Sequence, residues 1–165
     1  MSTVLTRLGL ELHPEKTRTV DLSWGREGFD FLGCHLRKRL SGRIWEQQRK
    51  RLYFLQRWPS QRAMSRVRAR VRELTPHARC HEDVRTIIAD VNPVLRGWAQ
   101  YFRTGNAADK FVQVDLYVEA RLRALLVKRA GSRLRAGRTV LWRRPFFEAL
   151  GLTRLCGSIH YPGAA

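Results

Sequence analysis

The residues of this chain that could do chemistry are carboxylates, histidines with cysteines, and arginines. Asp21 and Asp30 lie in a strand-like segment, but nothing in their spacing marks them as a pair that holds a divalent metal, and the sequence has no Asp-Asp pair. The spacings His-x-x-Cys-His at 77–81 and Cys-x-x-x-His at 156–160 suit metal ligands, yet neither has a partner Cys-x-x-Cys. We therefore interpret them as cap and loop residues. There is also no Gly-x-Ser-x-Gly and no phosphate-binding glycine loop. The sequence predicts no catalytic residue, no metal site and no cofactor.

Arginine gives the strongest functional signal. Lys and Arg total 32 against 14 Asp and Glu, a formal net charge of +18, and only five of the 32 are Lys. The planar guanidinium suits bidentate contacts with phosphate, and the carboxylates are too few to neutralise the basic faces. Hydrophobic residues make up 44% of the chain, which indicates a folded domain. A folded domain this basic most often binds a polyanion.

Helical periodicity predicts the elements that position most of these arginines. Ser60 is a good N-cap for a helix that ends at Leu74. A second helix is expected over about 82–103 and a third over about 107–129, and a short one within 141–155 folds back on them. The residues expected to face the core are Met64, Val67, Val71 and Leu74; Val84, Ile87, Ile88, Val91, Val94, Leu95, Trp98, Tyr101 and Phe102; and Phe111, Val114, Val118, Leu122 and Leu125. Three amphipathic helices with short connectors predict a compact bundle.

The segment Asn92–Phe102 contains two residues that are unusual in a helix. Pro93 lacks an N–H, so it predicts a kink or a restart capped by Asn92. Because the apolar stripe keeps its phase across Pro93, we expect two nearly collinear segments. Gly97 costs about 1 kcal/mol against Ala inside a helix. This cost indicates a close approach there, which we interpret as a tightly packed helix crossing in preference to contact with a nucleic-acid backbone.

The N-terminal third reads as a small β meander. Strands are expected at Thr17–Leu22 and Phe29–Leu36, and further strand at Arg43–Trp45 and Leu52–Arg57. An isolated hairpin is marginally stable in water, so the meander must pack on other protein. An exposed edge could also pair with a second copy, which makes a homodimer one of the expected assemblies.

The predicted fold class is α+β and mainly α, with an antiparallel β meander, a three-helix bundle and a short C-terminal helical segment. The expected domains are residues 1–58, 59–130 and 131–165. No run of 18 apolar residues occurs, so no membrane span is predicted, and the N-terminus lacks the pattern of a signal peptide. Three widely spaced cysteines argue against a disulfide framework and favour a reducing compartment, the cytoplasm.

The motif Asn-x-x-Leu-Arg-Gly-Trp-x-x-Tyr-Phe at 92–102 resembles the signature of the maturase-specific domain of group II intron-encoded proteins. The segments at 8–10 (Leu-Gly-Leu), 15–17 (Glu-Lys-Thr) and 31–33 (Phe-Leu-Gly) look like the end of that family's reverse-transcriptase palm, and 58–60 (Trp-Pro-Ser) like the start of its thumb. Together these segments cover most of residues 8–129 in the family's order.

The resemblance implies what this chain lacks as well as what it carries. The family holds its two catalytic metals with an aromatic-x-Asp-Asp turn just before the Leu-Gly-Leu segment, and that turn is absent here. The chain alone is therefore not expected to polymerise DNA. Phe31, Leu32 and Gly33 resemble the hairpin that supports a primer end, although Cys34 stands where an aromatic residue is expected.

The resemblance implies that the chain is an RNA-binding maturase region, which binds group II intron RNA and promotes its splicing-competent fold. Two alternatives stay open: a C-terminal fragment of a split or truncated reverse transcriptase that needs a separate palm, and a decayed reading frame that binds any nucleic acid. The expected partners are structured intron RNA, a DNA target or an RNA–DNA hybrid, and a palm or finger fragment. The residues expected to contact RNA are Arg62, Arg66, Arg70, Arg85, Arg96, Gln100, Arg103, Arg121 and Lys128.

Overall fold

The computed structural model describes residues 7, 9, 11, 13, 19–131, 137 and 141–160. A three-stranded antiparallel sheet comes first, with the strand order β1-β2-β3, and a mainly helical region follows it. The elements in chain order are η1 (Ser23–Gly25), β1 (Gly28–Phe31), β2 (Cys34–Leu40), α2 (Gly42–Gln48), β3 (Tyr53–Pro59), α3 (Gln61–Leu74), η2 (His77–His81), α4 (Val84–Phe102), α5 (Ala108–Ala130) and α6 (Arg144–Ala149). The predicted α+β class is confirmed. The segments at 8–10 and 15–17 that resemble the palm fall outside the described residues, except Gly9.

The chain divides into two compact units. The first consists of Met1–Phe29 and Arg37–Leu55, and the second of Asp30–Leu36 and Gln56–Ala165. The second unit holds the turn of the β1–β2 hairpin together with all of the long helices.

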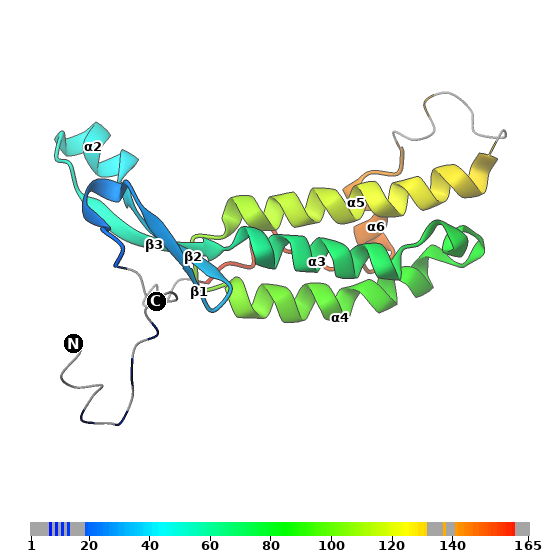
Figure 1. Ribbon diagram of the computed structural model, residues 1–165. Helices are drawn as coiled ribbons and strands as arrows, with labels where there is room; N and C mark the ends of the chain where they lie inside the picture. The colour runs from blue at the N-terminus through cyan, green and yellow to red at the C-terminus, as the bar shows by residue number, and fades with distance from the viewer. Residues whose placement is uncertain are drawn as a thin grey trace. The chain divides into compact units, whose positions relative to one another are not determined.

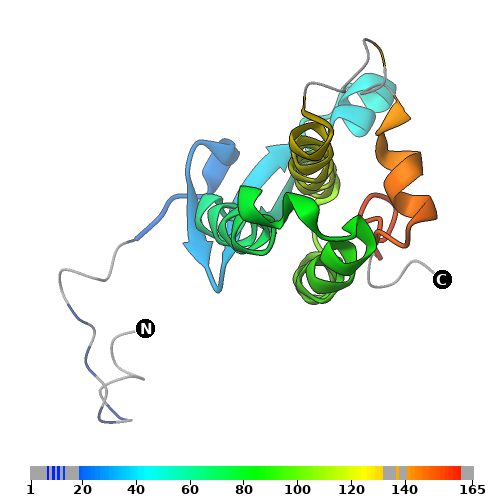
Figure 2. The same ribbon diagram turned by 90° about the vertical axis from the view of Figure 1, so that its right-hand side faces the viewer.

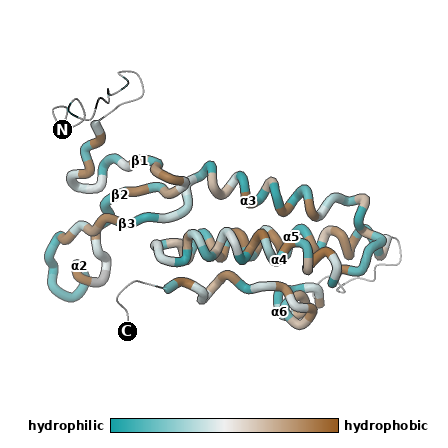
Figure 3. Tube along the Cα trace, turned by 90° about the horizontal axis from the view of Figure 1, so that it is seen from below, coloured by the Kyte–Doolittle hydropathy of each residue, from teal (hydrophilic) through white to brown (hydrophobic). Residues whose placement is uncertain are grey.

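Three long helices form the core of the second unit. Helices α3, α4 and α5 run alongside one another (Figures 1 and 2), and α6 lies on the side of α4 and α5 that faces away from α3 (Figures 2 and 3). Along α3, hydrophobic and hydrophilic stretches alternate (Figure 3), as expected for a helix with one face in a core. The predicted inward residues are buried or half-buried with one exception, Tyr101, whose side chain is 58% exposed. Phe147, Leu152 and Leu155 from the C-terminal segment complete this core.

The helix ends follow ordinary capping chemistry. The Ser60 hydroxyl accepts a hydrogen bond from the Ala63 N–H at 3.2 Å, which confirms the predicted N-cap of α3. Asp83 caps α4 by accepting from the Arg85 N–H at 2.9 Å.

The expected restart at Asn92 is wrong, because α4 runs without interruption from Val84 to Phe102 with Pro93 inside it. The in-phase apolar stripe on both sides of Pro93 keeps the helix continuous despite the missing N–H.

The predicted strand at Phe29–Leu36 is a hairpin and not a single strand. Leu32 and Gly33 both have positive φ, +47° and +76°, and form the two-residue turn between β1 and β2. Positive φ at both central residues is the geometry of a type I′ turn, which matches the twist of the two strands. Leucine rarely adopts this conformation, so the turn has no conventional sequence signature.

The first unit differs from the prediction in two places. Residues 43–45, expected as strand, lie in helix α2, because Ser41 caps it by accepting from the Ile44 N–H at 3.3 Å. The part of the expected Thr17–Leu22 strand that the structure describes, 19–22, has no strand. The Trp45 ring is contacted by the guanidinium groups of Arg49 and Arg51, at 5.8 and 5.6 Å from its centroid. No helix within the described ranges combines the length and apolar character needed to cross a bilayer.

Candidate nucleic-acid interface

Two buried polar side chains in the helical core hold the C-terminal segment in place. The Asn92 amide on α4 donates to the Gly151 carbonyl and accepts from the Thr153 N–H, both at 2.9 Å. Asp115 on α5 accepts from the Leu155 N–H at 3.2 Å and from the Cys156 N–H at 2.9 Å. Because buried polar groups are stable only when paired, these four bonds fix residues 151–156 against α4 and α5.

An ion-pair network supports the same attachment. The Arg144 guanidinium lies 2.9 Å from the Asp115 carboxylate and 2.8 Å from the Glu148 carboxylate. The Asp115 side chain is 4% exposed, so its charge needs both the ion pair and the two N–H donors. Helix α6 is thereby tied to α5 at its first turn.

The attached segment forms one wall of a groove, and α4 forms the other. We call it the α4 groove; it has a volume of about 320 Å³ and is lined by Arg96, Ala99, Gln100, Arg103, Thr153, Arg154, Leu155 and Ser158. The Arg96 Nε atom donates to the Thr153 hydroxyl at 3.1 Å, so this guanidinium is positioned by the opposite wall. The Arg103 carbonyl accepts from the His160 N–H at 2.9 Å, which holds the end of the groove together.

The α4 groove is cationic. Three of its eight lining residues are arginines and none is a carboxylate. The Glu148 carboxylate lies 4.0 Å from Arg154 and already pairs with Arg144 at 2.8 Å, and the buried Asp115 carboxylate, which bonds the Leu155 N–H, pairs with Arg144 at 2.9 Å. Three guanidiniums with serine, threonine and glutamine side chains between them provide donors for the oxygens of a phosphate chain.

A second groove lies at the turn of the β1–β2 hairpin. It consists of two adjoining hollows that share Leu32, Gly33, Ala63 and Arg66, with volumes of about 280 and 500 Å³. We call the two together the hairpin groove; the smaller hollow adds Asp30, Phe31, Ser60 and Arg62, and the larger adds Trp98, Tyr101 and Phe102. The Tyr101 hydroxyl donates to the Leu32 carbonyl at 2.8 Å, and the Ser60 N–H donates to the Gly33 carbonyl at 2.9 Å. These bonds fix the turn against α3 and α4.

The structure places five of the nine residues expected to contact RNA in the two grooves, three in one and two in the other. Arg96, Gln100 and Arg103 line the α4 groove, and Arg62 and Arg66 line the hairpin groove with all three residues of the expected primer-grip-like turn. The other four, Arg70, Arg85, Arg121 and Lys128, lie outside both grooves.

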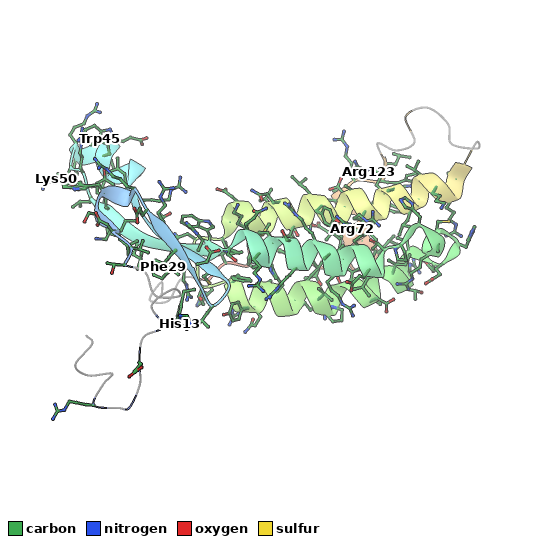
Figure 4. All side chains as sticks on the ribbon, viewed as in Figure 1. His13, Phe29, Trp45, Lys50, Arg72 and Arg123 are labelled. Carbon is green, nitrogen blue, oxygen red and sulfur yellow. The ribbon has the colours of Figure 1, made fainter. Side chains whose placement is uncertain are left out.

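Two of those four have partners within the protein. Arg70 pairs with Glu73 at 2.8 Å, and Arg121 donates through Nε to the Thr75 hydroxyl at 3.0 Å and through a terminal nitrogen to the Thr75 carbonyl. Arg85 and Lys128 are exposed. Nitrogen-tipped side chains, Arg72 and Arg123 among them, project along α3, α4 and α5 (Figure 4).

Sequence reasoning missed Thr153, Arg154 and Ser158 as groove residues. No pattern in the sequence links residues 153–158 to α4, because the connection runs through the Asn92 amide. Asn92 was interpreted as a helix cap, and its polarity in a helix interior was the signal that could have indicated a buried partner.

Gly97 does not lie at a helix crossing. A Cβ atom built at Gly97 meets nothing within 4 Å, and the residue is exposed. The expected tightly packed helix crossing is therefore wrong. Trp98 does pack in the core, with ring centroids 5.0 Å from Phe102 and 5.2 Å from Phe111.

The His and Cys residues in the described part of the chain are not gathered into a ligand set. No group of three or more His, Cys, Asp or Glu among the described residues could hold a metal ion. Residues 77–81 form η2 with Cys80 buried.

Burial raises the pKa of the Cys34 thiol above its usual value, so this residue beside the hairpin turn stays protonated at neutral pH. On η2 the Arg79 guanidinium bonds Glu82 and holds the pKa of that carboxyl below its usual range.

Most of this helical unit matches the model of a known protein family. Residues 64–143 match the family described as group II intron, maturase-specific domain. The chain carries a maturase-specific domain. The predicted resemblance is confirmed for these residues, and the comparison with curated proteins found no match. The maturase-specific domain contains Asn92, Asp115 and the α4 wall of the groove, whereas the other wall comes from residues 153–158, after the matched range.

Proposed function

We propose that this chain is the RNA-binding region of a group II intron maturase and that the α4 groove holds the phosphate backbone of the intron RNA. The observation that carries the proposal is the gathering of Arg96, Arg103 and Arg154 in one groove without a carboxylate among its lining residues. The groove lies on the helix that bears the family motif, and the maturase-specific domain associates the chain with group II introns.

The proposed mechanism is differential binding. A protein that contacts the active conformation of an RNA more extensively than its inactive conformations shifts the population toward the active one. Folded RNA presents phosphates and 2′-hydroxyls, and the guanidinium, hydroxyl and amide groups of the α4 groove are donors for both. The intron RNA supplies the catalytic metals, and the protein contributes contact energy.

The experiment is a salt titration of binding to a group II intron RNA. Each phosphate contact contributes about −0.7 to −0.9 to the slope of log affinity against log salt. The double variant Arg103→Gln/Arg154→Gln removes two charges without touching the bonds of Asn92 or Asp115. It should make the slope shallower by about 1.5.

The matched control is Arg72→Gln/Arg143→Gln, which removes two exposed charges outside both grooves. Because neither Arg72 nor Arg143 lines a groove, the control should leave the slope nearly unchanged. A wild-type affinity that does not depend on salt, or equal losses in both double variants, would overturn the proposal.

A second candidate function is favoured by the hairpin turn. Phe31, Leu32 and Gly33 line the same groove as Arg62 and Arg66 of α3, which suits a role in supporting a primer end. The chain would then be the C-terminal part of a split reverse transcriptase. Primer extension with and without an added palm fragment distinguishes the two, because this function requires synthesis only when the palm is present.

A further inference from the structure

The larger hollow of the hairpin groove has the size and walls of a small-ligand site. Its volume of about 500 Å³ lies within the range of about 300–1,000 Å³ that such sites occupy. Trp98, Tyr101 and Phe102 contribute aromatic rings to it, and Leu32 contributes an apolar lip that is 70% exposed. Aromatic rings with a free face are the surfaces on which nucleobases stack.

The lip of this hollow is held rigidly in a strained conformation. Leu32 has φ +47°, which a leucine adopts only when its surroundings enforce it. The bond from the Tyr101 hydroxyl to the Leu32 carbonyl and the bond from the Ser60 N–H to the Gly33 carbonyl provide that enforcement. A hollow whose rim is fixed in advance loses little conformational entropy when it binds a ligand.

The polar groups around the hairpin groove suit a nucleotide. Arg66 lines both hollows and Arg62 lines the smaller one. The one carboxylate in the lining, Asp30, lies 2.6 Å from the His35 ring nitrogen, which is its partner.

We infer that the hairpin groove accepts one unpaired nucleotide of the bound RNA, with its base in the larger hollow against Trp98 and Tyr101 and its phosphate in the smaller hollow at Arg62 and Arg66. This inference rests on the proposed RNA binding and adds to it a site that distinguishes unpaired from paired residues. Paired bases are stacked within the helix and cannot offer a face to the groove, whereas a bulged base can be splayed out.

The test uses three RNA hairpins of equal length in the stem: one with a single bulged adenosine, one with an abasic site at the bulge, and one fully paired. Binding is measured by fluorescence anisotropy at fixed salt. We expect the bulged RNA to bind on the order of tenfold more tightly than the abasic RNA, which has the same charge.

Ala63 lines both hollows, so Ala63→Leu places a larger side chain on the wall that they share, and leucine suits the helix in which it lies. It should abolish the difference between bulged and abasic RNA and leave the affinity for abasic RNA unchanged. Arg66→Gln should reduce the affinity for bulged RNA more than Arg72→Gln, which removes the same charge from the same helix outside the groove. Far-ultraviolet circular dichroism of each variant shows that α3 and α4 remain folded.

Three outcomes overturn the inference. Equal affinities of the wild type for bulged and abasic RNA remove the base site while leaving the proposed function intact, because fully paired RNA would still bind with a steep salt dependence. An undiminished preference in Ala63→Leu places the base elsewhere. A change of oligomeric state in Ala63→Leu without a change in RNA preference shows that the groove binds a second copy of the chain. Loss of all RNA binding by the wild type would instead contradict the proposed function itself.

Discussion

Replacing Asn92 by alanine tests how the two walls of the α4 groove are held together. The amide makes two hydrogen bonds of 2.9 Å to the segment 151–153, and each such bond contributes about 1 kcal/mol net. Gly151 is exposed and Thr153 half-buried, so the freed backbone groups can turn to water and add little further cost. Alanine returns about 0.5 kcal/mol of helix propensity. We expect Asn92→Ala to lower the free energy of unfolding by about 1.5 kcal/mol.

The assay is urea unfolding followed by circular dichroism at a helical wavelength, paired with RNA binding at fixed salt. In a chain of this length, 1.5 kcal/mol corresponds to a fall in Tm of about 3–6 °C. The control is Thr86→Ala, an exposed position on the same helix with a similar propensity gain, which should change stability by no more than about 0.5 kcal/mol. RNA affinity should fall in Asn92→Ala although no charge has been removed, because Thr153 and Arg154 lose their fixed position. Equal unfolding midpoints in the two variants, with unchanged RNA affinity, would refute this account of the groove.

Three further predictions concern stability. Ser60→Ala removes the N-cap of α3 and should cost about 1 kcal/mol in a urea titration. Gly105→Ala should destabilise by about 1–3 kcal/mol, because a Cβ atom there would lie 2.8 Å from the Arg57 carbonyl oxygen. Because Arg79 lowers the pKa of Glu82, this carboxyl stabilises the fold above its ordinary, unfolded pKa, and the contribution is lost as the pH falls through the lower folded pKa. Glu82→Gln should therefore lessen the fall in Tm between about pH 6 and about pH 3.

Each of these predictions has a result that contradicts it. Ser60→Thr, which can also cap a helix, should retain most of the stability that Ser60→Ala loses. Gly97→Ala is the matched control for Gly105, because its Cβ meets nothing within 4 Å, and it should stabilise α4 by about 1 kcal/mol. Equal effects of the two glycine substitutions would contradict the close contact at Gly105. An unaltered pH dependence of Tm in Glu82→Gln would exclude the bond to Arg79 as a source of stability.

The helices could be predicted from the sequence because the apolar residues that they bury recur with the period of an α-helix. The spacing of the apolar residues from Phe111 to Leu125 is sufficient by itself to predict that α5 packs in a core. Local strand and turn propensities were less informative. Leu32 has none of the chemistry that marks a turn, and its positive φ is enforced by Tyr101 on a distant helix. The contact between Tyr101 and Leu32 cannot be inferred from the residues that neighbour Leu32 in the sequence.

The candidate site could be predicted only in part, for a related reason. The arginines and the glutamine of one face of α4 follow from helical spacing, and the structure confirms that Arg96, Gln100 and Arg103 lie together. The opposite wall depends on two polar side chains in the helix interiors, Asn92 and Asp115, that bond a segment about 40–60 residues further along the chain. Pairings over such distances depend on the tertiary fold and leave no periodic trace.

The attachment of residues 151–156 also shows that the packed helical unit extends beyond the residues that match the family. The family match ends at residue 143, yet the hydrogen-bond and ion-pair partners described above for Asn92 and Asp115 all lie beyond it. In a fragment that ends at residue 143, the Asp115 carboxylate would lose its partners. It would lie beside the apolar cavity that Phe147, Leu152 and Leu155 fill in the longer chain. Such a fragment would be prone to aggregate through the exposed cavity, so truncation at this homology boundary would report on damaged packing and not on the activity of the isolated domain.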